Sequence, residues 1–203
     1  MYALIFKRLL DFLFALLLFL LAFPVFILVA LLLTIANKGN PFFVQPRPGK
    51  NEKIFKIIKF KTMNDFKDND GNLLPDSQRL TKTGSFVRKT SLDEIPQLLN
   101  IIRGEMSFIG PRPLLIRYLP YYNDTEKLRH SIRPGITGLA QVSGRNFLNW
   151  DDRLAKDVFY VNHLSFILDF KIVLTTIKNV LTSKDVSVDS SAAIPDLDDY
   201  RTT

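Results

Sequence analysis

The sequence predicts a helix-rich α+β protein in which an N-terminal membrane element precedes one globular domain. Three patterns support this prediction. Residues 12–33 carry no charged or hydrogen-bonding side chain, residues 54–63 alternate in part between apolar side chains and lysines, and residues 166–182 place apolar side chains at helical spacing. The length of 203 residues suits one domain with an appendage.

The first element is the run "FLFALLLFLLAFPVFILVALLL", which is 22 residues long. A helix that crosses the hydrocarbon core needs about 20 residues. A secretory signal would have a shorter apolar region, of roughly 7 to 15 residues, followed by a small-residue cleavage site. We therefore expect a permanent membrane element over residues 1–38. Pro24 lies near its middle and predicts a kink or a break, because proline removes one helical hydrogen bond.

Two topologies fit this element. A kinked helix can span the bilayer, since neighbouring groups can satisfy the carbonyl that the proline leaves free. A re-entrant hairpin would instead return both ends to one face. Basic residues lie before the run (Lys7, Arg8) and after it (Lys38, Arg47), and such residues prefer the cytoplasmic side. The flanking charges slightly favour the hairpin, and the spacing leaves the two topologies nearly even.

Composition limits the chemistry. The net charge of +7 suits an anionic partner such as a phospholipid surface, a nucleic acid or a phosphorylated substrate. The absence of cysteine excludes disulfides, thiolate metal sites and a cysteine nucleophile. The two histidines, His130 and His163, are too far apart in sequence to predict a histidine-rich zinc site.

We predict a single globular domain over residues 39–185, because no linker rich in glycine, serine or proline divides it. Within it, residues 54–63 predict a short strand, and residues 166–182 predict an amphipathic helix that packs in the core or lies along the membrane surface. Residues 186–203 are acidic and lack apolar periodicity, which predicts a disordered tail.

The stretch "SLDEIPQLLN" (91–100) places two carboxylates side by side. Ser91, followed three residues later by Glu94, matches a capping box ahead of an apolar helical pattern. The cap explains Asp93 less well, because an acid in the first turn gains only about 0.3–1 kcal/mol from the helix dipole. Since a helix start also attracts phosphate, Asp93 could serve as a nucleophile or metal ligand in phosphoryl chemistry.

Two further segments carry cations on constrained loops. Arg112 lies between two prolines in "GEMSFIGPRPLL", and a guanidinium on a stiff loop suits bidentate phosphate binding. In "RPGITGLAQVSGRN", Arg133 and Arg145 flank three glycines, so backbone amides and cations could approach one ligand. Each segment taken alone also fits a turn-rich surface loop.

Together these segments form a recognisable set. The ordered motifs "FVQPRPG", "KIIKFKTM", "GSFVRKTSLDEIPQLLNIIRGEMSFIGPRP", "IRPGITGLAQVSGRN" and "LDFK" make the chain resemble the bacterial sugar transferases, more specifically the monotopic phosphoglycosyl transferases. The resemblance runs from the N-terminus to about residue 184. The chain is similar to the small members, such as the undecaprenyl phosphate bacillosamine-phosphate transferases of protein glycosylation.

The resemblance implies a fold and a location. The fold would be α+β and helix-rich, with an N-terminal re-entrant membrane helix-break-helix joined to a single cytoplasmic domain with short strands and interfacial amphipathic helices. The protein would lie at the bacterial inner membrane, in contact with its lipids, with the catalytic domain on the cytoplasmic face. Relatives often carry serine just before the breaking proline, whereas this chain has Phe23.

The resemblance also implies a reaction. A sugar 1-phosphate would pass from a UDP-sugar to a polyprenyl phosphate, usually undecaprenyl phosphate, with release of UMP. The lipid-linked product would feed downstream glycosyltransferases, and no nucleic acid partner is expected. Asp93 matches the nucleophile that forms a phosphosugar-aspartyl intermediate, and Glu94 matches an acidic partner of Mg²⁺. The other matched positions are assigned to substrate or phosphate binding: Arg112, Arg145, Arg88, Lys59, Glu105 and Asp169.

Two other functions stay open on the residues alone. A Mg²⁺-dependent phosphatase or pyrophosphatase acting on a lipid or nucleotide would use water as the acceptor. A non-enzymatic, basic, membrane-anchored binding module would explain the charge and the anchor but would leave Asp93 without a task.

Overall fold

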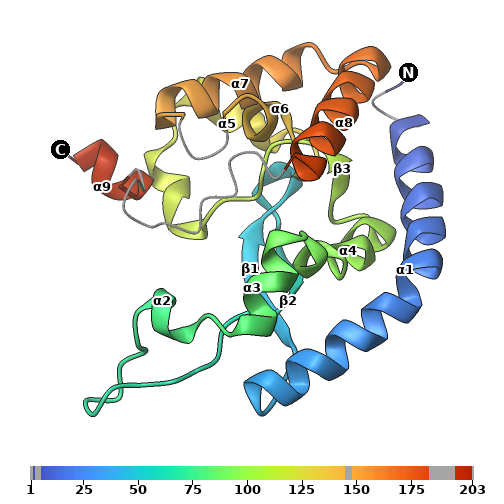
Figure 1. Cartoon of the computed structure of the whole chain (residues 1–203). Helices are drawn as coiled ribbons and strands as arrows, with labels where there is room; N and C mark the ends of the chain where they lie inside the picture. The colour runs from blue at the N-terminus through green and yellow to red at the C-terminus, as the bar shows by residue number, and fades with distance from the viewer. Residues whose placement is uncertain (1, 3–5, 145–147, 183–194, 203) are drawn as a thin grey trace.

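The computed structural model describes residues 2, 6–144, 148–182 and 195–202. Within these residues the chain folds into helices around two small sheets (Figure 1), which confirms the predicted helix-rich class with short strands. The strands are β1 (Phe42–Pro48), β2 (Ile54–Phe60), β3 (Ser107–Ile109) and β4 (Gly135–Thr137). The α-helices are α1 (Lys7–Asn37), α2 (Asp76–Arg79), α3 (Lys82–Lys89), α4 (Gln97–Arg103), α5 (Asp124–Lys127), α6 (Leu139–Val142), α7 (Trp150–Asn162), α8 (Phe166–Leu181) and α9 (Leu197–Thr202). Short 3-10 turns are η2 (Lys50–Glu52), η3 (Leu92–Glu94), η4 (Ile116–Tyr121) and η5 (Leu128–His130).

The predicted membrane element is the single helix α1, with Pro24 inside it. Figure 1 shows that the helix bends, so the predicted kink takes the form of a bend within a continuous helix. Most of its apolar side chains are exposed; Leu21 is 68% exposed and Ile35 is 76% exposed. A stretch of this length and hydropathy is sufficient to cross a membrane.

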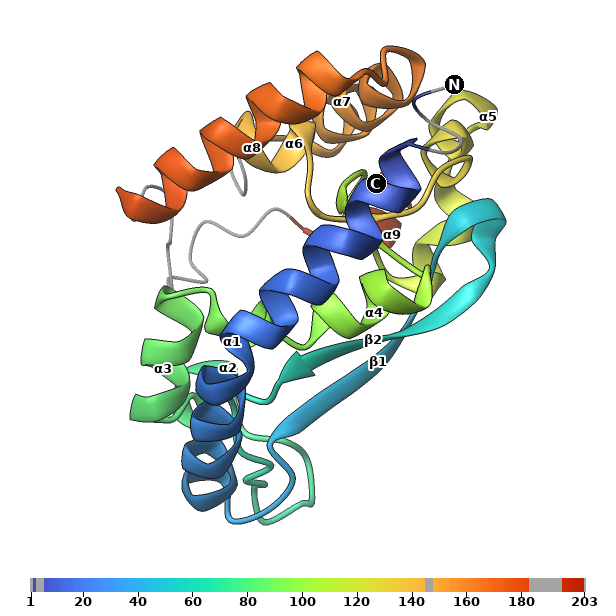
Figure 2. The same ribbon diagram turned by 90° about the vertical axis from the view of Figure 1, so that its right-hand side faces the viewer.

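Both halves of α1 contact the same domain (Figure 2). Near the start of the helix, the two terminal nitrogens of Arg8 donate to the carbonyls of Ile101 and Ile102, at 2.6 and 3.0 Å. At its end, Asn37 Nδ2 donates to the Lys61 carbonyl at 2.6 Å. Buried apolar residues from each half, Ala15 on one side and Leu33 on the other, join two core clusters of the domain. The bend therefore lets one helix lie against the domain along both of its halves.

The first sheet is the hairpin of β1 and β2. The two strands are antiparallel, with Phe42 opposite Phe60 and Pro48 opposite Ile54. This confirms the strand predicted within residues 54–63, which ends at Phe60. The second sheet pairs β3 with β4 in parallel. The loop that carries Arg112 follows β3 directly.

The amphipathic helix predicted for residues 166–182 is confirmed as α8, and Ser165 caps it by accepting a hydrogen bond from the Leu168 amide at 3.3 Å. Its apolar face is turned outward. The exposed side chains are Phe166, Ile167, Phe170, Leu174, Ile177 and Val180. Ile172 packs inward instead, so core packing involves only a narrow stripe of the helix.

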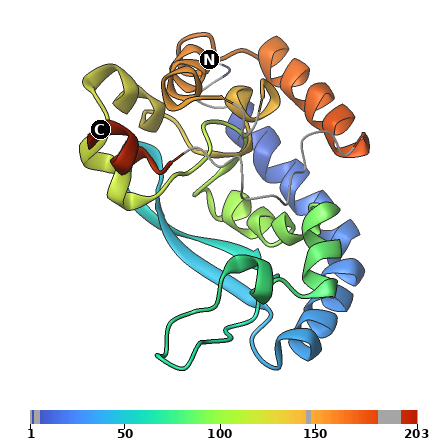
Figure 3. The ribbon, with the colours of Figure 1, turned by 60° about the vertical axis from the view of Figure 1, so that its left-hand side comes forward.

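The C-terminal residues correct one expectation. The disordered tail predicted for residues 186–203 is wrong for residues 195–202, which include α9 and pack against η4 and the start of α7 (Figure 3). Leu197 is completely buried, and Trp150 Nε1 donates to the Pro195 carbonyl at 2.8 Å. A single buried leucine leaves no apolar periodicity in the sequence, which is why the pattern concealed this anchor. The predicted domain boundary at residue 185 lies outside the described residues.

Candidate active site

The two adjacent carboxylates, Asp93 and Glu94, lie in the short turn η3 ahead of α4. The predicted capping box is wrong: Ser91 has left-handed backbone angles (φ 57°, ψ 17°) and its side chain caps no helix. The helix α4 starts only at Gln97, so Asp93 does not occupy the first turn of an α-helix either. The turn thus frees both carboxylates from a capping role.

Glu94 joins three separate parts of the chain. Its Oε1 atom lies 3.1 Å from Lys59 Nζ on β2 and 3.6 Å from an Arg112 terminal nitrogen in the loop after β3. Burial alone would raise the pKa of Glu94, but the charges of Lys59 and Arg112 outweigh burial and hold that pKa below its ordinary value. Glu94 is therefore ionised and holds two cations beside Asp93.

Asp93 is half-buried and surrounded by charge. Burial and the adjacent Glu94 raise the pKa of Asp93, against the opposing effect of Lys59, Arg88 and Arg112. No described residue donates a hydrogen bond to its carboxylate. The fold thus brings together five of the residues predicted from the sequence and leaves one carboxylate among them available to react.

Two arginines near this group were not among the predicted site residues. Burial and the charge of Arg112 lower the pKa of Arg47, which comes from β1. Burial likewise lowers the pKa of Arg153 on α7, and Arg112 adds to that effect against the charge of Asp157. Like charges at such proximity are stabilised by an anion. The signal for Arg47 was its place in "QPRPG", a second Pro-Arg-Pro sequence, whereas nothing around Arg153 marked it.

A buried ion pair holds the backbone of residues 111–113, which we call the Pro-Arg-Pro loop. Arg129 Nη2 donates to the Arg112 carbonyl at 2.7 Å and lies 2.8 Å from Asp157 Oδ2. The side chains of Arg129 and Asp157 are 1% and 3% exposed. This pair fixes the backbone of Arg112 while its guanidinium, 48% exposed, remains accessible.

The remaining predicted residues have other partners. Glu105 Oε2 accepts a hydrogen bond from Asn100 at 2.7 Å, and Asn100 also bonds to the backbone of β2, so Glu105 braces α4 against that strand. Asp169 is buried and accepts bonds from Lys7 at 2.7 Å and Tyr160 at 2.6 Å. These contacts tie α8 to the start of α1 and to α7. Arg145 lies outside the described residues.

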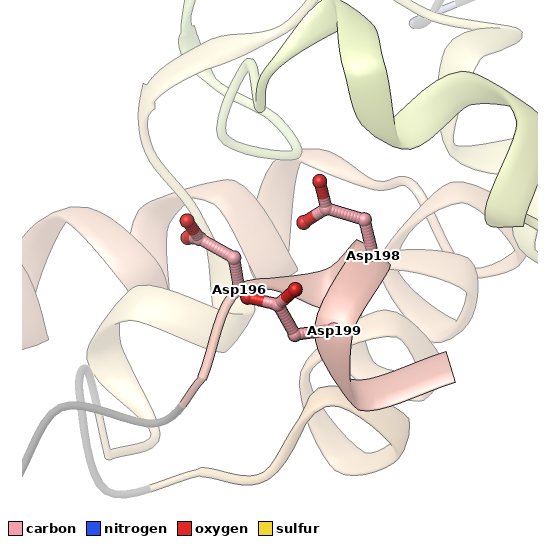
Figure 4. A group of neighbouring side chains, drawn as sticks. All are labelled: Asp196, Asp198 and Asp199. Atoms are coloured by element: carbon pink, nitrogen blue, oxygen red, sulfur yellow. The ribbon is translucent and has the colours of Figure 1, made fainter. Parts of the chain in front are cut away.

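One of the two carboxylates has the ligand chemistry that a magnesium ion requires. Mg²⁺ takes oxygen ligands and is usually bound through one or two carboxylates together with substrate phosphates. Glu94 supplies such a carboxylate. Its Oε1 atom pairs with Lys59 and Arg112, and no ion pair among the described residues involves its Oε2 atom. A separate acidic group, Asp196, Asp198 and Asp199, brings its oxygens within 4.8 Å of one another (Figure 4). Arg117 already pairs with the first two, so we assign no metal there.

The chain matches known proteins over most of its length. The family model of the bacterial sugar transferases matches residues 2–183. The sugar transferase EpsL of Bacillus subtilis is 50% identical over 163 residues, which cover 78% of this chain and 81% of that protein. The exopolysaccharide production protein ExoY of Sinorhizobium fredii is 41% identical over 88% of this chain and 86% of its own length. A UDP-glucose:undecaprenyl-phosphate glucose-1-phosphate transferase of Caulobacter vibrioides is 37% identical over 87% of this chain and 70% of its own length. The chain belongs to the bacterial sugar transferase family.

Proposed function

We propose that this protein transfers a sugar 1-phosphate from a UDP-sugar to a polyprenyl phosphate, with undecaprenyl phosphate as the expected acceptor. The products are UMP and a polyprenyl-diphospho-sugar, the substrate for downstream glycosyltransferases. One observation carries the proposal: the half-buried Asp93 carboxylate, without a hydrogen-bond donor among the described residues, faces cations from β2, α3 and the Pro-Arg-Pro loop. The name of the relative from Caulobacter vibrioides supports the donor and acceptor classes.

In the first step, an Asp93 oxygen attacks the phosphorus that carries the sugar, and the bond from that phosphorus to the oxygen of UMP breaks. Lys59, Arg88 and Arg112 offset the negative charge that gathers as one anion attacks another. When bound, Mg²⁺, with Glu94 among its ligands, would neutralise further diphosphate charge and stabilise UMP as a leaving group. In the second step, an oxygen of the polyprenyl phosphate attacks the same phosphorus and releases the Asp93 carboxylate.

The acceptor explains the apolar surfaces, since a polyprenyl chain stays in the bilayer. The helix α8 exposes an apolar face, and α1 exposes most of its apolar side chains. An amphipathic helix such as α8 can lie in the interface between lipid and water. We propose that α8 rests on the bilayer surface and α1 enters it. The catalytic carboxylate would then work at the level of the lipid phosphate, on the cytoplasmic face of the inner membrane.

Formation of UMP tests the reaction. The purified protein in detergent or nanodiscs should release UMP from one of a panel of UDP-sugars. Release beyond a single turnover should require undecaprenyl phosphate. Without the acceptor, intact-mass spectrometry should detect a covalent sugar phosphate adduct on the protein. Sugar phosphate that accumulates in solution without the lipid would instead establish water as the acceptor, as for a phosphatase.

The contacts at both ends of α1 support a re-entrant topology. A spanning helix must carry one of its ends across about 30 Å of hydrocarbon, away from a domain on the other side. Here Arg8 bonds to α4 and Asn37 bonds to the residue after β2, so both ends of α1 return to one domain. We propose that α1 enters and leaves the cytoplasmic leaflet.

Cysteine labelling measures this topology directly, because the chain has no native cysteine. Single cysteines at positions 3 and 40, one before and one after α1, should both react with a membrane-impermeant maleimide only from the cytoplasmic side. Sealed inside-out and right-side-out vesicles provide the two exposures. Labelling of the two positions from opposite sides would establish a spanning helix.

A further inference from the structure

The C-terminal segment, residues 195–202, is a built part of the fold beyond the residues that match the family model. Its anchor is Leu197, which is completely buried in a cluster with Leu114, Tyr118 and Trp150. Polar contacts surround this anchor. Tyr118 donates to Asp196 at 2.5 Å, and Trp150 Nε1 donates to the Pro195 carbonyl at 2.8 Å. The packing is therefore that of an integral core contact.

Charge pairs fix both ends of the segment. At its start, Arg117 pairs with Asp196 and also lies 3.3 Å from Asp198. Figure 4 shows these carboxylates at the start of α9. At its end, Arg201 lies 2.6 Å from Glu126 on α5 and 2.9 Å from Asp151 on α7. The segment thus joins η4, α5 and α7, three elements that are separate along the chain (Figure 3).

Each of these three elements is connected to Arg112 or to Arg153. The element η4 begins three residues after Pro113, the end of the Pro-Arg-Pro loop. The ring of Trp150, held by the segment, lies under the Arg153 guanidinium at 4.6 Å. The α5 helix is followed directly by η5, whose Arg129 holds the Arg112 carbonyl. The segment therefore connects to Arg153 through Trp150, and to Arg112 through η4 and through α5 and Arg129.

We infer that residues 195–202 form a C-terminal clamp that positions Arg112 and Arg153 to bind the diphosphate of the UDP-sugar. The inference rests on the proposed function for the UDP-sugar donor, and it adds Arg153 to Arg112 as a group that binds the diphosphate of this donor. Guanidiniums that lie close together repel one another, and the clamp opposes that repulsion by locking the surfaces that carry them. The clamp touches no reacting atom and acts through Tyr118 and Trp150.

Two substitutions at the anchor test the clamp. Leu197→Asp should raise the KM for the UDP-sugar about tenfold, because small displacements of binding groups have large effects. The kcat at saturating donor should change much less, and the dissociation constant of UMP should rise in parallel with KM. Leu197→Met, which conserves volume, is the control, and its KM and its dissociation constant for UMP should equal the wild-type values. Unchanged KM and UMP affinity in a folded Leu197→Asp protein would overturn the inference, as would a lowered KM, which would make the segment inhibitory.

A second variant keeps the test informative if Leu197→Asp does not fold. Arg201→Gln removes only the charge pairs at the end of the clamp, one with the buried Glu126 and one with the exposed Asp151, and should raise KM about threefold. Lys127→Gln, at an exposed pair elsewhere on α5, is the matched control and should leave KM unchanged. If Arg201→Gln matches that control, the clamp is refuted. Wild-type protein without UMP release from any UDP-sugar would instead refute the proposed function.

Discussion

Replacing Asp93 with asparagine is expected to reduce UMP formation by about 1,000-fold or more, since removal of an enzyme nucleophile has effects of this size. Asparagine preserves the shape of the side chain but cannot form the acyl phosphate. Burial and the charge of Glu94 disfavour the ionised form of Asp93, so we expect a neutral amide there to leave the protein folded and in the membrane. Initial rates of UMP release and intact-mass spectra measure the loss of turnover and of the covalent adduct.

The matched control is Asp124→Asn, because this carboxylate is fully exposed on α5. It should retain the wild-type rate and the wild-type adduct. An Asp93→Asn protein that still forms UMP at the control rate would contradict a nucleophilic role. Retained membrane binding together with lost turnover would separate the enzyme from a basic binding module, for which Asp93 has no task.

The pH profile adds a second signature of Asp93. The nucleophile must be ionised, and its pKa in the folded protein is raised above the ordinary aspartate value by burial and by Glu94. Activity should therefore fall, as the pH is lowered, at a higher pH than an unperturbed aspartate would give. Glu94 does not produce this fall, because its own pKa is lowered.

The sequence allowed prediction of the parts whose signal is local. The apolar run around Pro24 and the helical spacing around Phe170 each lie within a few turns, and both elements appear as helices. The strand within residues 54–63 was equally readable from its alternation. One local pattern gave a wrong prediction. Ser91 and Glu94 have the spacing of a capping box, but the Glu94 carboxylate pairs with Lys59 and Arg112 instead of capping a helix.

The site needed contacts that no local pattern encodes. The motif match selected Asp93, Lys59 and Arg112, yet their meeting depends on β2, η3 and the loop after β3 packing together. Arg153 carried no motif, and its proximity to Arg112 arises only from the packing of α7. The anchor at Leu197 is a single residue, and one apolar side chain has no period to detect.

Removing the carboxylate of Asp157 is expected to have the largest effect on stability. In the Asp157→Ala protein, the guanidinium of Arg129 would remain buried without its countercharge, which costs about 3–5 kcal/mol. Folded domains are stable by only about 5–15 kcal/mol, so this loss is a large fraction of the total. Urea unfolding of the detergent-solubilised protein should show a lower midpoint with an unchanged slope.

A double variant separates stability from positioning. Replacing Arg129 and Asp157 together with apolar residues of similar volume, as in Arg129→Met with Asp157→Leu, removes the buried charge and should recover much of the lost stability. It also removes the bond from Arg129 to the Arg112 carbonyl, so the KM for the UDP-sugar should rise above the wild-type value. A double variant that recovers stability and keeps the wild-type KM would show that this bond does not position Arg112. One as unstable as Asp157→Ala would contradict the unpaired charge as the cause, because no unpaired charge remains in it.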